Sequence, residues 1–590
     1  MIEPTRYCLL SRCLRPVSTF RRFDVLTFVC LVGAFPLAGP AETDLQQELQ
    51  RDVVFRSLVD ELERNKTELR LADLSPPYFL EYQLIDAVGL AVSAELGAIT
   101  RENLNRSRWL RTDVRAGSYE LDNSNFRGST SGLSGFGGSG SGGASIPIED
   151  DYLALRQAIW WLTDRQYKEA VEQFAEKKAF MAGRMIEDKP RDFSKEEPAT
   201  CFEDRVELQI DRIRLSTLAK EASSVFRPFP LVKESSVGLQ SAVGHKYLAN
   251  NEGTRIRTSH RRFSLTVTAT VQAEDGMELS GSSHFESRTV EGLPKPEALA
   301  SSCRALAARL VALRSAPPLD AYTGPVLFEA EPMAGLFLRL MGGRFAGGQR
   351  PVGSRSTPDD FAKKLHRRIL PRFMNVVDDP TQQTLFGIPV MAHYRYDDQG
   401  VAARPVTLVE SGKLLGLLMS RTPSKEFLRS TGHGRGAFGP RSAPACLLVS
   451  GTQTLNGGAL RDELLDTAQD EGLAFAIRVA SLGSLGSSGR NGRESAPGPT
   501  PLEVYKVYSD GREELVRGVE LGRVDLKAFK RILAMGDTPY VLNTPGSVPQ
   551  TIAVPAMLFE ELDLAKVDRD FDRPPGIPSP VARSAGTSVP

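Results

Sequence analysis

The chain is poor in histidine and cysteine, the usual ligands of zinc. Its 590 residues include 6 histidines and 6 cysteines, and no two cysteines are separated by two residues. Three cysteines lie before residue 42, and the others are Cys201, Cys303 and Cys446. This spacing indicates neither a cysteine zinc site nor a disulfide framework. We expect three isolated, buried thiols, and the alternative is one disulfide with one free thiol.

The chain also lacks a net charge, because 73 Lys and Arg residues balance 73 Asp and Glu residues. Nucleic-acid binding needs a basic face, and nothing in this total predicts one. After residue 41 no stretch is long and apolar enough to span a bilayer, so we expect no stable membrane insertion. Apolar residues make up 41% and charged residues 25% of the chain, as in soluble globular proteins.

The first 41 residues have the pattern of an export signal. A basic lead with five arginines precedes an apolar run from Val25 to Ala38, and Ala41 follows three residues later. The run has the length of a signal-peptide core and is too short to cross a bilayer. We therefore predict cleavage after Ala41 and an exported protein, periplasmic or extracellular. A retained N-terminal anchor helix is the alternative, and the long basic lead leaves open a start of translation downstream of Met1.

The rest of the chain predicts an α+β fold with two domains that meet at Pro317 and Pro318. The first, residues 42–318, combines antiparallel strands with long helices. The second, residues 319–570, is rich in strands and glycine. Residues 571–590 are rich in proline and are expected to be a disordered tail.

Several segments of the first domain have clear periodicity. Residues 150–186 and 294–315 read as helices, and residues 244–290 alternate as antiparallel strands. Residues 78–95 read as a pair of strands. Gly128 to Ser145 is almost entirely glycine and serine, which predicts a flexible loop.

The second domain contains five short motifs, and their order along the chain is informative. They are the segments 324–337, 376–381, 396–403, 406–422 and 430–435. In this order they resemble the TldD/PmbA family of metallopeptidases. The resemblance implies the family's two-domain fold and an action on peptides or unfolded segments. In the active members of this family zinc lies inside a closed dimer.

The resemblance also implies which residues would perform the chemistry. In active members a His-Glu-x-x-x-His motif and a later cysteine bind zinc, and the motif glutamate is the general base. In this sequence the corresponding positions are Glu329, Ala330 and Ala334. No histidine occurs between His284 and His366, and no cysteine follows Cys446. The chain therefore resembles the TldE/PmbA-like members without the motif, and we predict no catalytic residue, no metal ligand and no cofactor of its own.

The helix after this motif is expected to start at Pro332, because the first turn of a helix tolerates proline. Among the other candidate residues, His433 lies in a glycine-rich stretch and is interpreted as a solvated loop histidine. The pairs Asp378–Asp379 and Asp397–Asp398 are interpreted as turn-forming, N-cap and hydrogen-bonding residues, and functional carboxylate pairs are the alternative.

The function predicted from the sequence is that of a non-catalytic subunit or peptide-binding scaffold of a proteolytic complex. Its partners would be a peptide or unfolded polypeptide segment and a second subunit, as a homodimer or as a heterodimer with an active TldD-like subunit. Two alternatives remain open. One is an active peptidase with an unrecognised site, and the other is a periplasmic binding or structural protein that retains only the fold.

Overall fold

The structure is a computed structural model that describes residues 40–70, 75–128, 141–186, 189–354, 361–437, 439–483, 501–544, 546–567, 571–572, 575–577 and 579–581. Helix α1 spans Pro40–Arg51. From Glu48 onward the chain forms one compact unit. This unit contains two large β-sheets, so the predicted α+β fold is confirmed.

The first sheet has seven strands in the order β3-β2-β1-β5-β6-β4, with β7 also paired to β6. Every pairing is antiparallel except that of β4 with β6. Alternate residues of the central strands are buried, as a two-residue repeat of apolar side chains dictates. The strands are β1 Phe79–Glu95, β2 Ala98–Arg115, β3 Ser141–Ser145, β4 Thr200–Phe202, β5 Val232–Asn250, β6 Arg255–Gln272 and β7 Glu278–Ser287.

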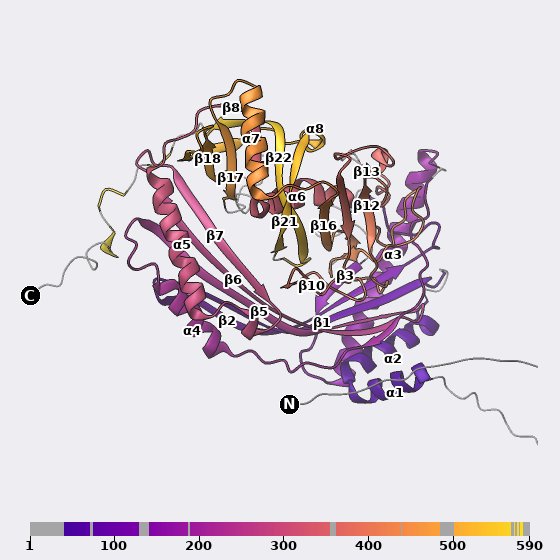
Figure 1. Cartoon of the computed structure of the whole chain (residues 1–590). Helices are drawn as coiled ribbons and strands as arrows, with labels where there is room; N and C mark the ends of the chain where they lie inside the picture. The colour runs from indigo at the N-terminus through magenta and orange to yellow at the C-terminus, as the bar shows by residue number, and fades with distance from the viewer. Residues whose placement is uncertain are drawn as a thin grey trace, which may run out of the picture. The chain divides into compact units, whose positions relative to one another are not determined.

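Helices pack against this sheet (Figure 1). Helices α4 (Arg212–Ser224) and α5 (Pro296–Ser315) share a core with β1, β5, β6 and β7. Helices α2 (Val53–Glu68) and α3 (Tyr152–Gly183) pack against each other beside β1 and β2. Asp52 and Asp151 begin α2 and α3, because each carboxylate accepts a hydrogen bond from a free N–H of the first turn. A short helical turn, η2, spans Val290–Gly292.

The second sheet has eleven strands and a mixed topology. Its order is β13-β12-β9-β16-β22-β8-β17-β18-β19, and β20 and β21 also pair with β22. The strands are β8 Tyr322–Phe328, β9 Met374–Asp378, β12 Val406–Glu410, β13 Lys413–Leu414, β16 Cys446–Gly451, β17 Ala476–Leu482, β18 Pro501–Val507, β19 Glu513–Val516, β20 Val519–Leu521, β21 Ile532–Thr544 and β22 Gln550–Lys566. Strand β22 is the last of these strands in the chain, yet it lies at the centre of the sheet.

Helix α6 (Ala330–Met341) packs on β22, β21 and β17 within the largest core. Helix α7 (Gly457–Asp470) covers a smaller core beside β8, and α8 (Leu526–Lys530) contacts β22. Short hairpins and turns complete this half of the molecule. They are β10 Thr384–Leu385, β11 Ile388–Pro389, β14 Gly434–Arg435, β15 Arg441–Ser442, η3 Gly342–Phe345 and η4 Phe361–Lys364.

Two expectations for the first domain differ from the structure. Residues 78–95 form one long strand, β1, and its partner is the separate strand β2. The Gly/Ser-rich segment does not remain a loop to Ser145, because its last five residues form β3 on the edge of β2. Gly143 lies against the ring of Trp109, where an added Cβ atom would be 2.6 Å from the indole nitrogen. The absence of a Cβ atom at Gly143 thus lets this strand lie close to Trp109. Residues 129–140 lie outside the described residues.

Candidate functional site

The segment 324–337 lies where β8 leads into α6. Strand β8 is an inner strand, paired with β22 and β17, and its residues from Gly324 to Phe328 are buried. Glu329 is the first residue beyond the strand and immediately precedes α6. The helix begins at Ala330, two residues before the expected start at Pro332. Pro332 still lies in the first turn, where its missing N–H removes no hydrogen bond of the helix.

The carboxylate of Glu329 forms an ion pair with Arg478 of β17. The same guanidinium pairs with Glu513 of β19, so one arginine bridges two carboxylates. Arg478 is the cross-strand neighbour of Tyr505, and its guanidinium carbon lies 4.3 Å from the centre of that ring. Burial acts to lower the pKa of Arg478, but hydrogen bonds and the charges of Glu513 and Glu329 outweigh it and raise that pKa. The arginine is thus held permanently as a cation.

The other two motif positions carry no polar side chain. Ala330 is half-buried, and Ala334 is fully buried in the core formed by α6 and the second sheet. Met333 and Phe337 pack beside Ala334 and are also fully buried. An imidazole at position 334 would have to enter a close-packed core, and overpacking of this kind destabilises a fold.

Arg309 links the first sheet to this region. It lies on α5, and its Nη1 is 3.4 Å from Oε2 of Glu503 on β18. The carboxylate of Glu503 is largely buried beside the N-terminal turn of α6. The surroundings of the motif are therefore arranged as arginine–carboxylate pairs. No local pattern marks Arg478, because its partners Glu329 and Glu513 lie 149 and 35 residues away in the chain.

Within the described residues, no group of three or more His, Cys, Asp or Glu side chains is placed to hold a metal ion. The described cysteines Cys201, Cys303 and Cys446 are free and buried. The expectation of three isolated, buried thiols is therefore confirmed. Burial raises the pKa of the Cys303 thiol to about 11. These thiols are therefore poor metal ligands and poor nucleophiles.

The interpretation of His433 as a solvated loop residue is wrong. Its side chain is fully buried, and Nε2 lies 3.1 Å from Oδ1 of Asp378. Nδ1 lies 3.0 Å from the carbonyl oxygen of Thr431. Asp378 also accepts hydrogen bonds from the N–H groups of Ala445 and Cys446. A glycine-rich sequence suggests exposure, but here Gly432 and Gly434 lie so close to Ala402 and Gln399 that a Cβ atom at either position would clash.

The hydrogen-bonding role of the aspartate pairs is confirmed. Asp397 accepts hydrogen bonds from the N–H groups of three residues, which are Gln399, Val401 and Gly434. Burial nevertheless raises the pKa of Asp397. Its neighbour Asp398 forms an ion pair with Lys246 of β5, whose pKa burial lowers to about 8. These turns of the second half therefore rest directly on the first sheet.

Arg421, in the loop that follows β13, also links the second half of the chain to the first, and its surroundings were not predicted. Its guanidinium donates two hydrogen bonds of 2.7 Å to the carboxylate of Glu252, in the turn between β5 and β6. Two more, of 3.0 and 2.6 Å, go to the carbonyl oxygen of Ser194. The guanidinium carbon lies 4.0 Å from the ring centre of Phe193 and 4.9 Å from that of Phe79. Arg421 is only 1% exposed.

A hydroxyl, an imidazole and a carboxylate form a chain on β6 and β7. Oγ1 of Thr266 lies 2.9 Å from Nδ1 of His284, and Nε2 of His284 lies 3.1 Å from Oε1 of Glu286. Burial acts to raise the pKa of Glu286, but hydrogen bonds from His284 and Arg262 outweigh it and lower that pKa. The ionised carboxylate therefore favours the tautomer with a proton on Nε2, and Nδ1 accepts a hydrogen bond from Thr266.

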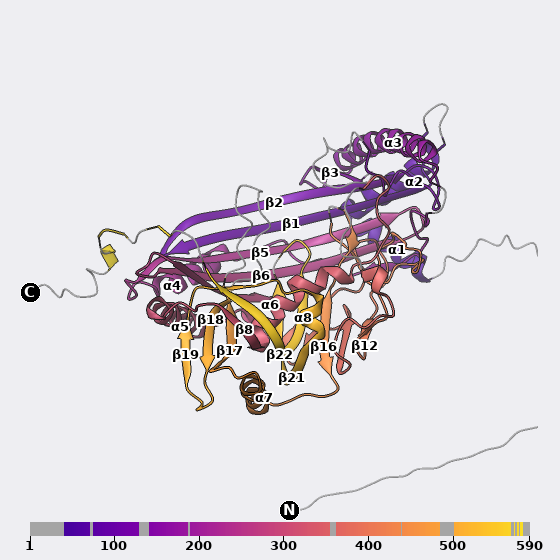
Figure 2. The same ribbon diagram turned by 90° about the horizontal axis from the view of Figure 1, so that it is seen from above.

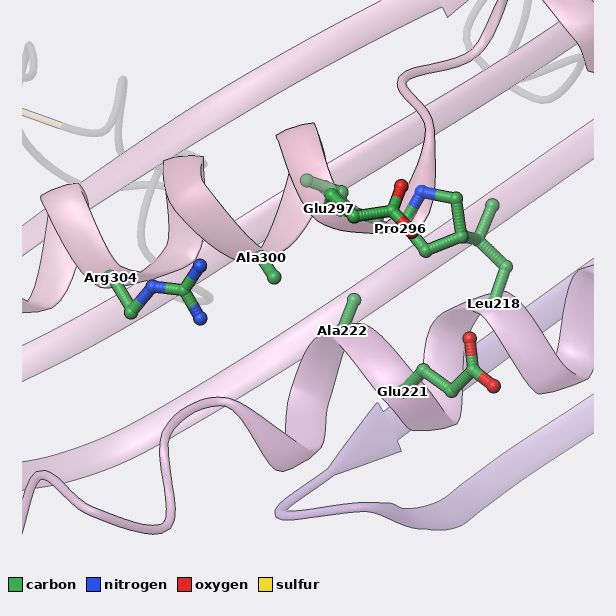
Figure 3. Close-up of a pocket in the computed structure, with 8 residues that line it drawn as sticks. Leu218, Glu221, Ala222, Pro296, Glu297, Ala300 and Arg304 are labelled. Carbon is green, nitrogen blue, oxygen red and sulfur yellow. The ribbon is translucent and has the colours of Figure 1, made fainter.

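A groove of about 320 Å³ lies between α4 and α5 (Figure 3). Its charged residues are Glu221, Glu297 and Arg304, and all three are exposed. The rest of its lining is apolar. None of the residues singled out in the sequence lies in this groove, so it adds nothing to the motif site.

Among the described residues, no helix has the length and apolar character needed to cross a membrane.

Two family profiles match the chain. Residues 202–313 match the PmbA/TldA metallopeptidase central domain, and residues 321–566 match the PmbA/TldA metallopeptidase C-terminal domain. A metalloprotease of Methanocaldococcus jannaschii is 27% identical over 209 residues, which are 35% of this chain and 43% of that protein. A metalloprotease of Methanothermobacter thermautotrophicus is 29% identical over 227 residues, which are 37% of this chain and 45% of that protein. The chain thus matches less than half the length of these relatives.

Solved structures share the fold. TldE from Thermococcus kodakarensis superposes with a TM-score of 0.55 at 14% identity, over 86% of this chain and 100% of that one. A protein described as a proposed modulator of a DNA gyrase, from Thermotoga maritima, superposes with a TM-score of 0.54 at 15% identity, over 82% of this chain and 96% of that one. At this level of identity the likeness concerns the fold alone.

Proposed function

Because the chain belongs to the PmbA/TldD metallopeptidase family, we propose that it is a member that has lost the zinc site and binds peptides without cleaving them. It would act as a non-catalytic subunit or peptide-binding scaffold of a proteolytic complex. Its ligand would be a peptide or an unfolded polypeptide segment. It would work as a homodimer or beside an active TldD-like subunit, and outside the cytoplasm.

The observation that carries this proposal is the state of the three motif positions. Zinc in the active relatives needs two histidines, a cysteine and a glutamate base. Here Ala330 and Ala334 offer no donor atom, and Glu329 is already paired with Arg478. The residues present at the motif therefore do not fit zinc.

Arg478 supports the same proposal because it occupies the one carboxylate that remains at the motif. Its guanidinium forms ion pairs with both Glu329 and Glu513. A zinc ion here would have to compete with Arg478 for the carboxylate of Glu329, and one carboxylate does not make a zinc site.

The test uses the purified full-length protein after dialysis. Elemental analysis is expected to find far less than one zinc per chain. Fluorescence anisotropy with labelled, unfolded peptides is expected to show binding, and mass spectrometry of the same mixtures is expected to show no cleavage. About one zinc per chain together with cleavage would overturn the proposal. Absence of peptide binding would favour a protein that retains only the fold.

A triple variant with Glu329→His, Ala330→Glu and Ala334→His sharpens this test. It restores the motif but not the cysteine ligand. Position 329 precedes α6 and has an extended backbone, whereas position 334 is fully buried inside the helix, so the two histidines would not share one accessible helical face. Calorimetric titration should therefore find only weak zinc binding. Tight binding with recovered cleavage would mean that the site is nearly intact.

One observation favours the alternative of an active peptidase with an unrecognised site. The order hydroxyl, imidazole, carboxylate in Thr266, His284 and Glu286 is that of an activated nucleophile. Against it, Arg262 already neutralises Glu286, and the hydroxyl belongs to a threonine in the middle of a strand. If the alternative holds, a fluorophosphonate probe labels Thr266 in the parent and not in His284→Ala.

A further inference from the structure

A dense cluster of positive charge lies at one edge of the second sheet. The net charge of the chain is zero, yet residues 363–372 include five Lys or Arg residues and no Asp or Glu. One of them, Lys364, is half-buried, and its Nζ lies 5.8 Å from the ring centre of Phe361. The other four are exposed, as is Lys413 of the adjacent hairpin. We call these five exposed cations the basic edge, and they are Lys363, Arg367, Arg368, Arg372 and Lys413.

The backbone holds these cations close together. Strand β13 pairs with β12 on one side, and the segment that carries the arginines lies along its other side. There the N–H of His366 donates to the carbonyl oxygen of Leu414 at 2.7 Å, and the N–H of Leu414 donates to that of Arg367 at 3.0 Å. This pairing places Arg368 directly opposite Lys413. Like charges in such a position destabilise a sheet, so the chain retains an arrangement that costs stability unless an anion binds to it.

Within the part of the chain that the structure describes, no carboxylate forms an ion pair with any side chain of the basic edge. The hairpin from β12 to β13 carries one acidic residue, Glu410, which is exposed and likewise forms no ion pair with a described residue. A lysine on an edge strand discourages pairing with a second chain, and this accounts for Lys413. It does not account for four further cations beside it. The excess of positive charge therefore indicates a surface that binds an anionic partner.

The basic edge is remote from the motif site. Strands β12, β9, β16 and β22 lie between β13 and β8, where the motif begins. Neighbouring strands are about 4.8 Å apart, so the separation is about 24 Å. Figure 2 shows β12 on the side of the molecule away from α3 and β2. The basic edge is therefore a surface of its own.

The side chains around these cations indicate what kind of anion fits them. No large apolar side chain of residues 361–373 or 406–414 is exposed, and Leu365 and Phe373 are half-buried. Single-stranded nucleic acid stacks its bases on exposed aromatic side chains, and the basic edge has none. Long, flexible cations without apolar neighbours match a plane of phosphate head groups. Clusters of about 4–8 Lys and Arg residues bind anionic lipid surfaces in this way.

We propose that the basic edge binds the phosphate head groups of an anionic phospholipid bilayer and holds the protein against a membrane without entering it. Each Lys or Arg near such a surface strengthens binding by about fivefold, so five cations together suffice for attachment. This inference rests on the part of the proposed function that places the protein outside the cytoplasm. An exported chain meets a bilayer surface there, and it is separated from the nucleic acids of the cell.

The first test measures co-sedimentation of the full-length protein with lipid vesicles. The parent is expected to bind vesicles of phosphatidylcholine that contain phosphatidylglycerol, and to bind pure phosphatidylcholine vesicles far less. Any contact of the N-terminal apolar run with lipid occurs with both kinds of vesicle, so the difference between them reports the charges. Added salt should weaken the binding, because it screens exposed charges.

The second test removes three charges of the basic edge. The triple variant Arg367→Gln, Arg368→Gln and Arg372→Gln should bind phosphatidylglycerol vesicles about 100-fold more weakly, at about fivefold for each charge. Lysine at the same three positions keeps the charge and should keep the binding, since a bilayer surface attracts charge and needs no forked donor. Circular dichroism checks that both variants fold.

The matched control changes the net charge by the same amount elsewhere. It combines Arg101→Gln, Arg165→Gln and Arg304→Gln, which are exposed arginines of β2, α3 and α5. None of the three forms an ion pair with a described residue. This variant should bind phosphatidylglycerol vesicles as the parent does, because the removed charges do not belong to the basic edge.

Several results would overturn the inference. These are a parent that binds both kinds of vesicle equally, a glutamine variant of the basic edge that binds as tightly as the parent, and a control variant that loses as much binding. Duplex DNA provides a further comparison at the same salt concentration. Tighter binding to DNA than to phosphatidylglycerol vesicles, lost in the same glutamine variant, would assign the basic edge to nucleic acid instead.

The same proteins separate this inference from the proposed function. Peptide binding by the glutamine variant of the basic edge should equal that of the parent in fluorescence anisotropy, because the altered side chains are remote from the motif. Failure to bind vesicles with intact peptide binding would overturn this inference alone. A parent that binds vesicles but no peptide would count against the proposed function and not against this surface.

Discussion

Replacement of Arg421 by methionine is the most direct test of how the two sheets are held together. The side chain is buried, and it makes two hydrogen bonds to Glu252 and two to the carbonyl oxygen of Ser194. Methionine keeps much of the volume beside Phe193 and removes the charge. The carboxylate of Glu252, whose side chain is 7% exposed, then stays buried without its cation.

The expected loss of stability is about 3–5 kcal/mol, because removal of one partner leaves a buried charge uncompensated. Glu252 retains one partner, since the hydroxyl of Tyr119 donates to it at 2.6 Å. A second change, Glu252→Gln, removes the stranded charge and preserves an acceptor for Tyr119. The double variant should therefore be more stable than Arg421→Met alone, with a coupling energy of about 1–3 kcal/mol.

The assay is equilibrium unfolding in urea, followed by circular dichroism and by tryptophan fluorescence. Two probes are needed because a chain of this size need not unfold in a single step. The control is Arg531→Met. Arg531 makes a similar contact through two hydrogen bonds of 2.8 Å with Glu560, but its side chain is 48% exposed. Exposed pairs contribute about 1 kcal/mol or less.

Two results would refute the reasoning. One is a loss below about 1 kcal/mol for Arg421→Met, which would place the guanidinium in a more solvated environment than the structure has. The other is a double variant as unstable as the single one, since the stranded carboxylate would then not be the cause.

Four further predictions concern other parts of the chain. The triple motif variant is expected to bind zinc only weakly, with calorimetric titration beside the parent as the measurement. Burial lowers the pKa of His260 to about 4, so the unfolded chain takes up a proton that the folded chain refuses between about pH 6.5 and 4. The free energy of unfolding should therefore decrease as the pH is lowered from about 6.5 to 4. Over the same range, the urea midpoint of His260→Gln should decrease less than that of the parent. Removal of residues 129–140 should change the free energy of unfolding by about 1 kcal/mol or less. Gly143→Leu should destabilise the edge of the first sheet, because its Cβ atom would meet the ring of Trp109. Thermal unfolding tests both, and a large loss of stability in the deletion or no loss in Gly143→Leu would contradict the prediction. Mass spectrometry of the native protein should find a mature N-terminus near Glu42, and an intact apolar run in the cytosol would speak against export.

Local features of the fold were predictable from the sequence. The turn at Ser411 and Gly412 joins β12 to β13, and both residues have positive φ, as a tight hairpin demands. The turn near Gly276 joins β6 to β7 in the same way. Helix α3 follows from strong helix formers without an internal proline. In each case residues close in sequence determine the outcome.

Features that depend on distant partners were not predictable. His433 looks solvated in its glycine-rich context, yet it is buried and bonded to Asp378, which lies 55 residues away. The partners of Arg421 lie 169 and 227 residues away. The glycine and serine of β3 have no strand propensity, and their pairing depends on the open edge of β2. At the candidate site the sequence indicated which residues are absent, but not that Arg478 bridges Glu329 and Glu513.

The position of β22 has a consequence for the order in which the chain acquires its structure. Residues 550–566 form the strand on which β8, β16, β20 and β21 all pair, yet they are the last strand to be synthesised. Until residues 550–566 leave the ribosome, β8 and β16 each lack the strand that pairs with both of them. Both strands then have an unpaired edge. Such unpaired edges invite aggregation. The second sheet is therefore completed only after its central strand has been synthesised.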